Sequence, residues 1–356
     1  MRIVCSLLTI SLFIVFCGCT GIETSEKQNV HNLSKETQQN NQIITEFDKG
    51  SIGIKTGNTN VAQQDIYKNK VVWSGGNHNE LNKGSIHLLH GIYLYDIEDK
   101  SIKKIATSQQ RGQTDETQVN NEWICWSDWN DPLGKDWVIY AYSFSSGKII
   151  KIDAAQNHLS GESSELPRLS LSNNGYLVWT SNELNEHRHN LKGIYLSSVG
   201  KEKISRIATT DYPKALPFVT DKYVIWNNEK EIKLYSINEN KVVKSIVTAT
   251  PANYPKANNQ YVTWQEGNRL FIQDIDKESN ELIFQGEIFF YGIGKNHVVW
   301  QNKSDIFSYN INNKVIMKLN HTKAMLPYIR NDDVVWQEQS NDEINLKVVT
   351  LTDYNK

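Results

Sequence analysis

The amino-acid sequence predicts an all-β protein folded as a single seven-bladed β-propeller. An apolar pair followed by tryptophan recurs seven times, and these tryptophans are Trp73, Trp126, Trp179, Trp226, Trp264, Trp300 and Trp336. Two further short apolar runs follow most copies, and no sustained 3.6-residue period appears after residue 60. Units of 36 to 53 residues that each contain four short strands are typical of propeller blades.

The runs in each unit are rich in β-branched and aromatic residues and are separated by Asn, Asp, Gly and Lys, which favours strands joined by turns. The strand after each tryptophan is expected at 92–96, 137–142, 194–196, 232–235, 270–272, 306–309 and 344–349. An outer strand is expected at 102–106, 149–152, 204–208, 242–247, 282–284 and 315–319. The seventh unit therefore lacks an outer strand of its own.

A further strand precedes the tryptophan strand in each unit, and several copies open with proline, at Pro167, Pro213, Pro255 and Pro327. Proline has no N–H to give to a ladder, so it suits the first residue of a strand or an edge strand. We expect these segments to be the inner strands of the blades.

The run at 48–56 can supply the strand that the seventh unit lacks. It aligns without a gap with 99–107, which includes the outer strand of the first unit. We therefore expect an N-terminal strand to complete the seventh blade and close the ring, which limits unpaired edges. The alternative is six blades and an irregular unit, with 52–55 unpaired.

The recurring tryptophan is expected to belong to the core. A strand covered on both faces needs a continuous apolar run, which Val71, Val72 and Trp73 provide. A tryptophan can also fill the widening gap between two blades. The alternative is a ring of tryptophans that stack on sugars. Cys125 takes the place of Val72 in its own unit, so we expect it to be a small buried hydrophobe.

Four features of the repeat resemble the TolB-like propellers and related surface repeat proteins. They are the proline of the inner strand, the Val-Val-Trp strand, the Ile-Tyr-Leu-Tyr-Asp strand at 92–96 and the Lys-Ile-Ala-Thr strand at 104–107. The resemblance covers 48–356 and implies the propeller architecture. The Ser-Pro-Asp-Gly turn that is frequent in TolB repeats is absent, so the resemblance implies no particular partner.

The first residues are expected to address the chain to a membrane. An apolar run at 3–16 is followed by Gly18 and Cys19, which resembles a bacterial lipobox whose cysteine becomes diacylated. We expect a signal peptide at 1–18, a flexible polar tether at 19–47 and the propeller at 48–356. The predicted product is a lipid-anchored protein on the extracytoplasmic face of the cell membrane. An ordinary secretory signal or an uncleaved anchor is the alternative.

The charges nearly balance, with 38 Lys and Arg against 40 Asp and Glu, which does not favour a nucleic-acid partner. We expect a monomer without a cofactor or a bound metal. The loop histidines have no spacing typical of a zinc site, and they are His78, His87, His90, His187 and His189. The segment at 128–136 resembles a calcium loop only loosely, because the closing glutamate is missing.

Long loops are expected between the second and third strands of the first three units, at 74–91, 127–136 and 180–193. Such loops on a rigid scaffold tend to carry function, although neutral insertions are the alternative. Trp129 is extra to the repeat and lies in a polar stretch. We therefore expect it to be an exposed contact for a sugar or a protein.

The segments that lead into the inner strands bring charges to one end of the ring, at Arg111, Asp115, Glu116, Glu165, Arg168, Asp211, Lys214, Lys256 and Lys323. We predict that a ligand contacts Trp129, Asp115, Glu116, Arg168, Asp211, Lys214 and Lys256. No nucleophile elbow and no phosphate-binding glycine loop occurs in the sequence. The predicted function is a non-catalytic binding or scaffold propeller for a protein or glycan partner.

The rival prediction is a carbohydrate-active enzyme, a glycoside hydrolase or lyase, that uses carboxylates at the same end of the ring. Two carboxyl groups about 5 to 10 Å apart would favour the enzyme. Carboxylates paired with lysine or arginine would favour binding.

Overall fold

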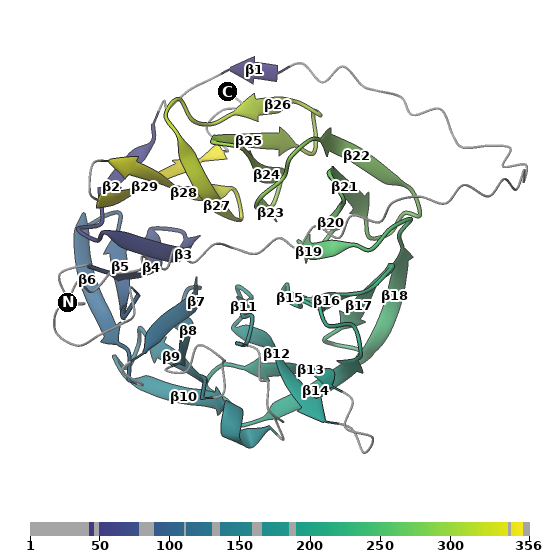
Figure 1. Cartoon of the computed structure of the whole chain (residues 1–356), viewed down its shortest axis with the longest axis horizontal. Helices are drawn as coiled ribbons and strands as arrows, with labels where there is room; N and C mark the ends of the chain where they lie inside the picture. Colours follow the sequence, from purple (N-terminus) through teal and green to yellow (C-terminus); the bar gives the residue numbers. More distant parts are fainter. Residues whose placement is uncertain are drawn as a thin grey trace, which may run out of the picture. The chain divides into compact units, whose positions relative to one another are not determined.

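The computed structural model describes residues 43–45, 50–77, 89–109, 112–129, 136–158, 166–184, 190–340 and 343–351. The strands of these residues form seven sheets arranged as blades in a ring (Figure 1). The signal peptide, Cys19 and most of the tether predicted from the sequence lie outside the described residues. Within the described part of the chain, no helix has the length and apolar character needed to span a bilayer.

Each blade is built from strands that follow one another along the chain. Blade 1 contains β3 (Asn60–Tyr67), β4 (Lys70–Gly76), β5 (Gly91–Asp96) and β6 (Ser101–Thr107). Blade 2 contains β7 (Gln113–Val119), β8 (Trp123–Trp129), β9 (Val138–Ser143) and β10 (Ile149–Ala154), and a short 3-10 helix, η1 (Ala155–Asn157), follows it. Blade 3 contains β11 (Ser170–Leu171), β12 (Tyr176–Leu184), β13 (Asn190–Ser198) and β14 (Ile204–Thr210).

Blades 4 to 6 repeat this order. Blade 4 contains β15 (Phe218–Val219), β16 (Tyr223–Asn228), β17 (Glu231–Ser236) and β18 (Lys241–Val247). Blade 5 contains β19 (Asn253–Ala257), β20 (Tyr261–Glu266), β21 (Arg269–Asp274) and β22 (Asn280–Gln285). Blade 6 contains β23 (Tyr291–Ile293), β24 (His297–Asn302), β25 (Asp305–Asn310) and β26 (Ile316–Lys318). A fifth strand, β1 (Ile43–Thr45), pairs with β26 in parallel, within the segment predicted as tether.

Blade 7 closes the ring with strands from both ends of the propeller. It contains β27 (Ala324–Arg330), β28 (Asp333–Ser340), β29 (Glu343–Thr350) and the N-terminal strand β2 (Ile52–Lys55), in the order β2-β29-β28-β27. The gap-free alignment of 48–56 with 99–107 also gives the correct register. Gly53 lies opposite Lys347 as Lys104 lies opposite Tyr93 in blade 1. The seven-bladed prediction is confirmed, and the six-bladed alternative is wrong.

The seven repeat tryptophans form the layers between blades, and each is at most 4% exposed. In five blades the residue directly across the ladder is aromatic, and the two rings pack with centroids 5.7 to 5.9 Å apart, as Trp73 does on Tyr93 and Trp300 on Phe307. These tryptophans cannot stack on sugars, because other side chains cover them. Cys125 is also fully buried, as the sequence predicts.

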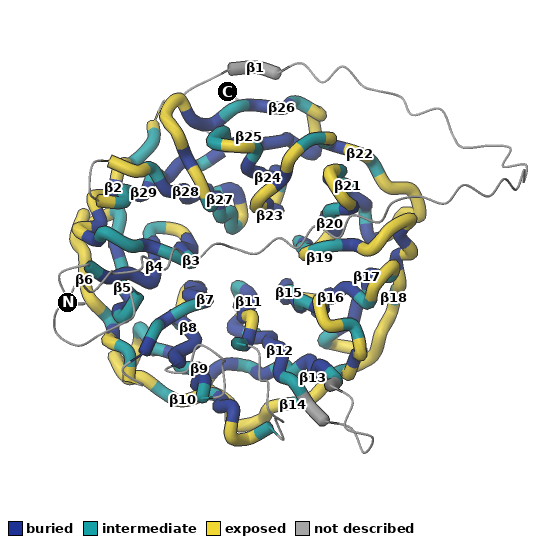
Figure 2. The backbone as a smooth tube through the Cα atoms, in the orientation of Figure 1, coloured by how far each residue is buried: buried dark blue, intermediate teal, exposed yellow. Residues whose placement is uncertain are grey.

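Burial falls outward along each blade, from covered second and third strands to an exposed outer strand (Figure 2). Ile102, Ile149 and Ile204 on the outer strands β6, β10 and β14 are 36% to 44% exposed. The prediction of a loop at 180–193 is wrong in part. Strands β12 and β13 continue as a longer hairpin to Leu184 and from Asn190, because backbone pairing extends through most of the extra residues.

Candidate binding site

The first strand of every blade lies nearest the centre of the ring, and these inner strands are β3, β7, β11, β15, β19, β23 and β27 (Figure 1). All seven run in the same sense, since each enters from the outer strand of the preceding blade and then turns into its own second strand. We call the end of the ring where the inner strands begin the entry end, and the end where they turn into the second strands the turn end.

One residue of each inner strand pairs with the residue directly before the repeat tryptophan. These residues are Asp65, Gln118, Ser170, Phe218, Lys256, Gly292 and Tyr328, and we call them the axial ring. Each lies eight positions before its tryptophan, or nine in blade 3. That fixed spacing is a signal in the sequence, yet only Lys256 of this set was predicted as a site residue.

Bulges in four inner strands displace the backbone just before the axial ring. The register shifts there in β3, β7, β19 and β27. Gln63, Glu116, Tyr254 and Leu326 occupy this bulge with positive φ values of 49° to 54°. Such bulges re-aim side chains and are frequent beside functional sites.

Arg330 ties the turn end together. Its Nη2 lies 2.8 Å from Oδ2 of Asp65, a carboxylate that is 2% exposed, and its Nη1 donates to the carbonyl oxygen of Leu171 at 2.9 Å. Asp65 also accepts a hydrogen bond from the backbone N–H of Val119 at 2.9 Å. These contacts connect blade 7 with blades 1, 2 and 3, so a charge that would be costly to bury alone is fully engaged.

A second carboxylate and arginine pair lies toward the entry end. Oε1 of Glu116 lies 2.5 Å from Nη1 of Arg168, which comes from the segment that leads into β11. Glu116 is 8% exposed, whereas the Arg168 side chain is 55% exposed. Burial and, after it, the negative charge of Glu116 together raise the pKa of the neighbouring Asp115 to about 7, against the opposing effect of Arg168. The charge of Asp115 therefore changes near neutral pH.

Lys256 is the cation of β19. Its Nζ lies 5.9 Å from the ring centre of Tyr291 and 5.6 Å from that of Tyr328. Burial lowers the pKa of this ammonium to about 8, against the attraction of Glu116 and Asp65. The two tyrosines are fixed by their hydroxyls, which donate to Gln63 Oε1 at 2.7 Å from Tyr328 and to the Asn253 carbonyl oxygen at 2.7 Å from Tyr291.

Four large exposed apolar side chains lie at or just before the inner strands of three neighbouring blades, 5, 6 and 7, toward the entry end. Tyr254 is 55%, Phe289 54%, Phe290 45% and Met325 37% exposed, and we call these four the aromatic rim. Tyr254 and Phe290 each lie two residues before the axial-ring residue of their own blade, and Phe289 and Met325 lie three before it; Phe289 and Phe290 directly precede β23. Exposed apolar side chains that form one patch mark contact surfaces, so these four are candidates for ligand contact. The sequence does not predict the aromatic rim, because apolar residues within or next to a short strand are usually part of the core.

The predicted site residues divide into two groups. Asp115, Glu116, Arg168 and Lys256 come together around the centre of the ring. Asp211 and Lys214 do not, because they are exposed residues of the segment between β14 and β15. The inner strand of blade 4 follows Pro217, not Pro213 as predicted, so Lys214 stays on the connecting segment. Lys323 is likewise exposed, and Arg111 and Glu165 lie outside the described residues.

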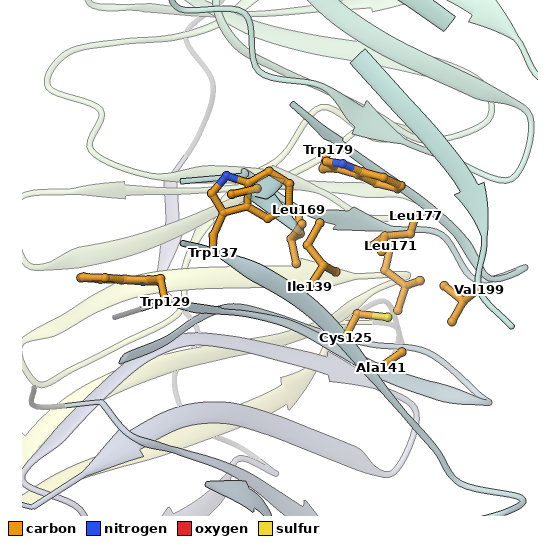
Figure 3. Close-up of a cluster of buried hydrophobic side chains, with 11 residues drawn as sticks. Cys125, Trp129, Trp137, Ile139, Ala141, Leu169, Leu171, Leu177, Trp179 and Val199 are labelled. Carbon is orange, nitrogen blue, oxygen red and sulfur yellow. The ribbon is translucent and has the colours of Figure 1, made fainter. Parts of the chain in front are cut away.

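The prediction that Trp129 is an exposed loop contact is wrong. It is the last residue of β8 and is 8% exposed, within an apolar cluster that includes Trp137, Leu169 and Trp179 (Figure 3). Trp129 pairs with Gln113 across the ladder, so the second strand of blade 2 extends further than the repeat suggests. Trp129 therefore supports the layer between blades 2 and 3.

Two surface hollows lie away from the axial ring. One of about 510 Å³ is lined by Lys68, Glu98 and Asp333 near the seam of the ring, and one of about 470 Å³ is lined by Glu287, Asn302 and Phe307 in blade 6. Neither contains a residue of the axial ring. Among the described residues, no group of three or more His, Cys, Asp and Glu side chains is placed to hold a metal ion.

No protein-family model and no curated protein matches this sequence. An oligogalacturonate lyase in complex with manganese has a TM-score of 0.58 and 9% identity over 85% of this chain and 90% of its own. An oligogalacturonate lyase from Vibrio parahaemolyticus gives 0.56 and 10% over 88% and 99%. An acylaminoacyl peptidase gives 0.59 and 9%, but this chain spans only 52% of it. The chain therefore shares the seven-bladed fold of these lyases and peptidases.

Proposed function

We propose that the protein is a binding propeller that receives a protein or glycan ligand at the entry end of the ring. One observation carries this proposal. Of the three inner-strand carboxyl groups Asp65, Asp115 and Glu116, two, Asp65 and Glu116, are each paired with an arginine from another blade, so they link blades to one another. The ligand would rest on the aromatic rim.

A thermal-melt screen of the purified protein tests the proposal. The panel contains cell-wall fragments, polysaccharides, peptides and divalent metals. A ligand at a hundredfold its dissociation constant adds about 2.7 kcal/mol of stability, which moves the melting temperature by several degrees. We expect Tyr254→Ala and Phe290→Ala to lose the shift. Ile102→Ala, which removes an exposed apolar side chain from the outer strand β6, should keep it.

The catalytic alternative has one observation in its favour. Burial raises the pKa of Asp115 to about 7, and a general acid or base works best when its pKa lies near the working pH. An assay of polysaccharide cleavage separates the two functions. Turnover by the wild type that Asp115→Asn abolishes, while Asp211→Asn keeps it, would favour the enzyme. Binding without turnover would favour the binding propeller.

We also propose that a lipid on Cys19 holds the propeller at the extracytoplasmic face of a membrane. The support is the apolar run at 3–16, the Gly18–Cys19 pair and the polar segment that follows. Metabolic labelling with a fatty acid in a bacterial host is the test. Cys19→Ala should abolish the label and release the protein from membranes, whereas the matched variant Cys17→Ala should keep both.

A further inference from the structure

Lys256 is a cation without an anion. Among the described residues, no group accepts a hydrogen bond from its Nζ and no carboxylate oxygen lies within 4.0 Å of it. The rings of Tyr291 and Tyr328 lie near the Nζ instead. The two carboxylates that attract it from a distance, Glu116 on β7 and Asp65 on β3, are held by Arg168 and Arg330. A partly covered ammonium in this setting lacks the compensation that buried charges usually have.

The position of Lys256 points to the ligand. Tyr254 of the aromatic rim lies two residues earlier in β19, at the bulge before Lys256, and its carbonyl oxygen accepts a hydrogen bond at 2.6 Å from the hydroxyl of Tyr291, whose ring faces the ammonium. The Cα atoms of Tyr254 and Lys256 are at most about 6 to 7 Å apart, because that is the span of two residues in a regular strand and a bulge shortens it. A ligand with an apolar or ring-shaped body on the rim could therefore extend one polar group of modest length inward to the ammonium.

We propose that Lys256 receives the carboxylate of a ligand whose apolar or ring-shaped body lies on the aromatic rim. This inference rests on the proposed binding function and adds the chemical class of the ligand. The carboxylate would replace the missing anion and accept charge-assisted hydrogen bonds from Nζ. Because the tyrosine hydroxyls are already engaged with Gln63 and with backbone carbonyl oxygens, the ammonium is the donor left for the ligand.

Protonation gives this site a pH signature. The groups that face Lys256 are Glu116 on β7, Asp65 on β3, Tyr291 on β23 and Tyr328 on β27. Burial raises the pKa of both tyrosines, so they stay neutral in the relevant range. The pKa of Lys256 is about 8, so the ammonium that binds a carboxylate is lost as the pH rises from 7 to 9. Affinity should fall about tenfold over that interval.

Ligand-observed NMR with phenylacetate as the probe tests the proposal, and uncharged phenylacetamide is its control. We expect phenylacetate to bind at pH 7 and to bind at least tenfold more weakly to Lys256→Met. Lys256→Arg should keep the affinity at pH 7 and remove its decline up to pH 9, since arginine stays charged. Lys214→Met, which removes a lysine from the exposed connecting segment, should behave as the wild type.

The outcomes separate this inference from the proposed function. Three results would each overturn the carboxylate site: equal affinity for phenylacetamide, unchanged binding by Lys256→Met, or no binding of phenylacetate at about 10 mM. A dissociation constant of about 10 mM is the weakest affinity expected of so small a ligand. A ligand found in the thermal screen would still support the binding propeller in those cases. If Lys256→Met does not fold, the pH profiles of the wild type and Lys256→Arg decide the question, because they must differ.

Discussion

Arg330 bonds to residues of three other blades, which makes it a structural tie as well as part of the candidate site. Its guanidinium reaches Asp65 on β3, Gln118 on β7 and the Leu171 carbonyl oxygen on β11. A planar fork of five N–H donors can serve several acceptors at once, which lysine cannot. The turn end of the ring therefore depends on this one side chain.

Arg330→Met should destabilise the protein by about 3 to 5 kcal/mol, because the carboxylate of Asp65 would stay buried without its partner. Urea denaturation measures this change. Lys241→Met is the control, and it should cost about 1 kcal/mol or less, since the side chains of Lys241 and its partner Glu239 are 64% and 54% exposed. Asp65→Asn combined with Arg330→Met should recover part of the loss. Equal costs for the two single variants would contradict the assignment of Arg330 as the tie.

Asp115 should make stability depend on pH. Its pKa is about 7 in the folded protein and near 3.8 when unfolded, so its contribution is present at low pH and is lost as the pH rises through about 7. Asp115→Asn should therefore gain about 1 to 3 kcal/mol relative to the wild type at pH 8 and little at pH 4. Urea denaturation across this range measures the difference. Asp211→Asn, at an exposed site, should show no such trend.

At the scale of strands, β2 shows how a short segment far away in sequence completes a blade. Ile54 is 1% exposed and packs in the cluster that contains Trp73, Val335 and Leu346. Its ladder partner is Leu346 on β29. Without β2, the edge of β29 would be left unpaired, and such an edge favours aggregation.

Ile54→Ala should cost about 2 to 4 kcal/mol of stability, as expected for a fully buried isoleucine that leaves a cavity. Ile102→Ala is the control on the corresponding outer strand of blade 1, where the side chain is 44% exposed, and it should change stability by less than about 0.5 kcal/mol. Thermal and urea denaturation both measure this change in stability. A small effect at Ile54 would indicate that closure by β2 contributes little.

The strands were predictable from the sequence where the repeat alone decides their place. The tryptophan strand and the closing strand are of this kind, since apolar runs and one gap-free alignment locate them. The inner strand of blade 4 was not, because Pro213 and Pro217 compete for its start. The nine-residue spacing from Pro255 to Trp264 and from Pro327 to Trp336 identifies Pro217.

The candidate site was less predictable, because its residues are defined by contacts between blades. Nothing local to Arg330 or Asp65 indicates that they meet, since they are 265 residues apart in the chain. The polar residues around Trp129 predict an exposed loop contact, because they do not reveal that strand β8 extends to this residue. The aromatic rim is not predictable either, because the sequence does not distinguish an exposed aromatic residue in or near a strand from a buried one.

At the scale of the whole molecule, the ring should unfold as one unit. Every blade packs on two neighbours through its tryptophan layer, β2 joins the two ends of the propeller, and Arg330 links blade 7 to blades 1, 2 and 3. Open repeat arrays lack such closure and can unfold progressively from an end. A closed ring has no end blade that could unfold at a low cost in free energy.

Tryptophan fluorescence and far-UV circular dichroism should therefore report the same unfolding transition. The ten tryptophans are distributed over all seven blades and all are buried or half-buried, so the fluorescence change reports on the whole ring, while circular dichroism reports on its sheets. We expect coincident midpoints in urea for the wild type, the usual sign of two-state behaviour. Ile54→Ala should shift both midpoints downward together. A fluorescence transition that precedes the loss of β-structure would instead show that some blades separate first, and the ring would then not be the cooperative unit.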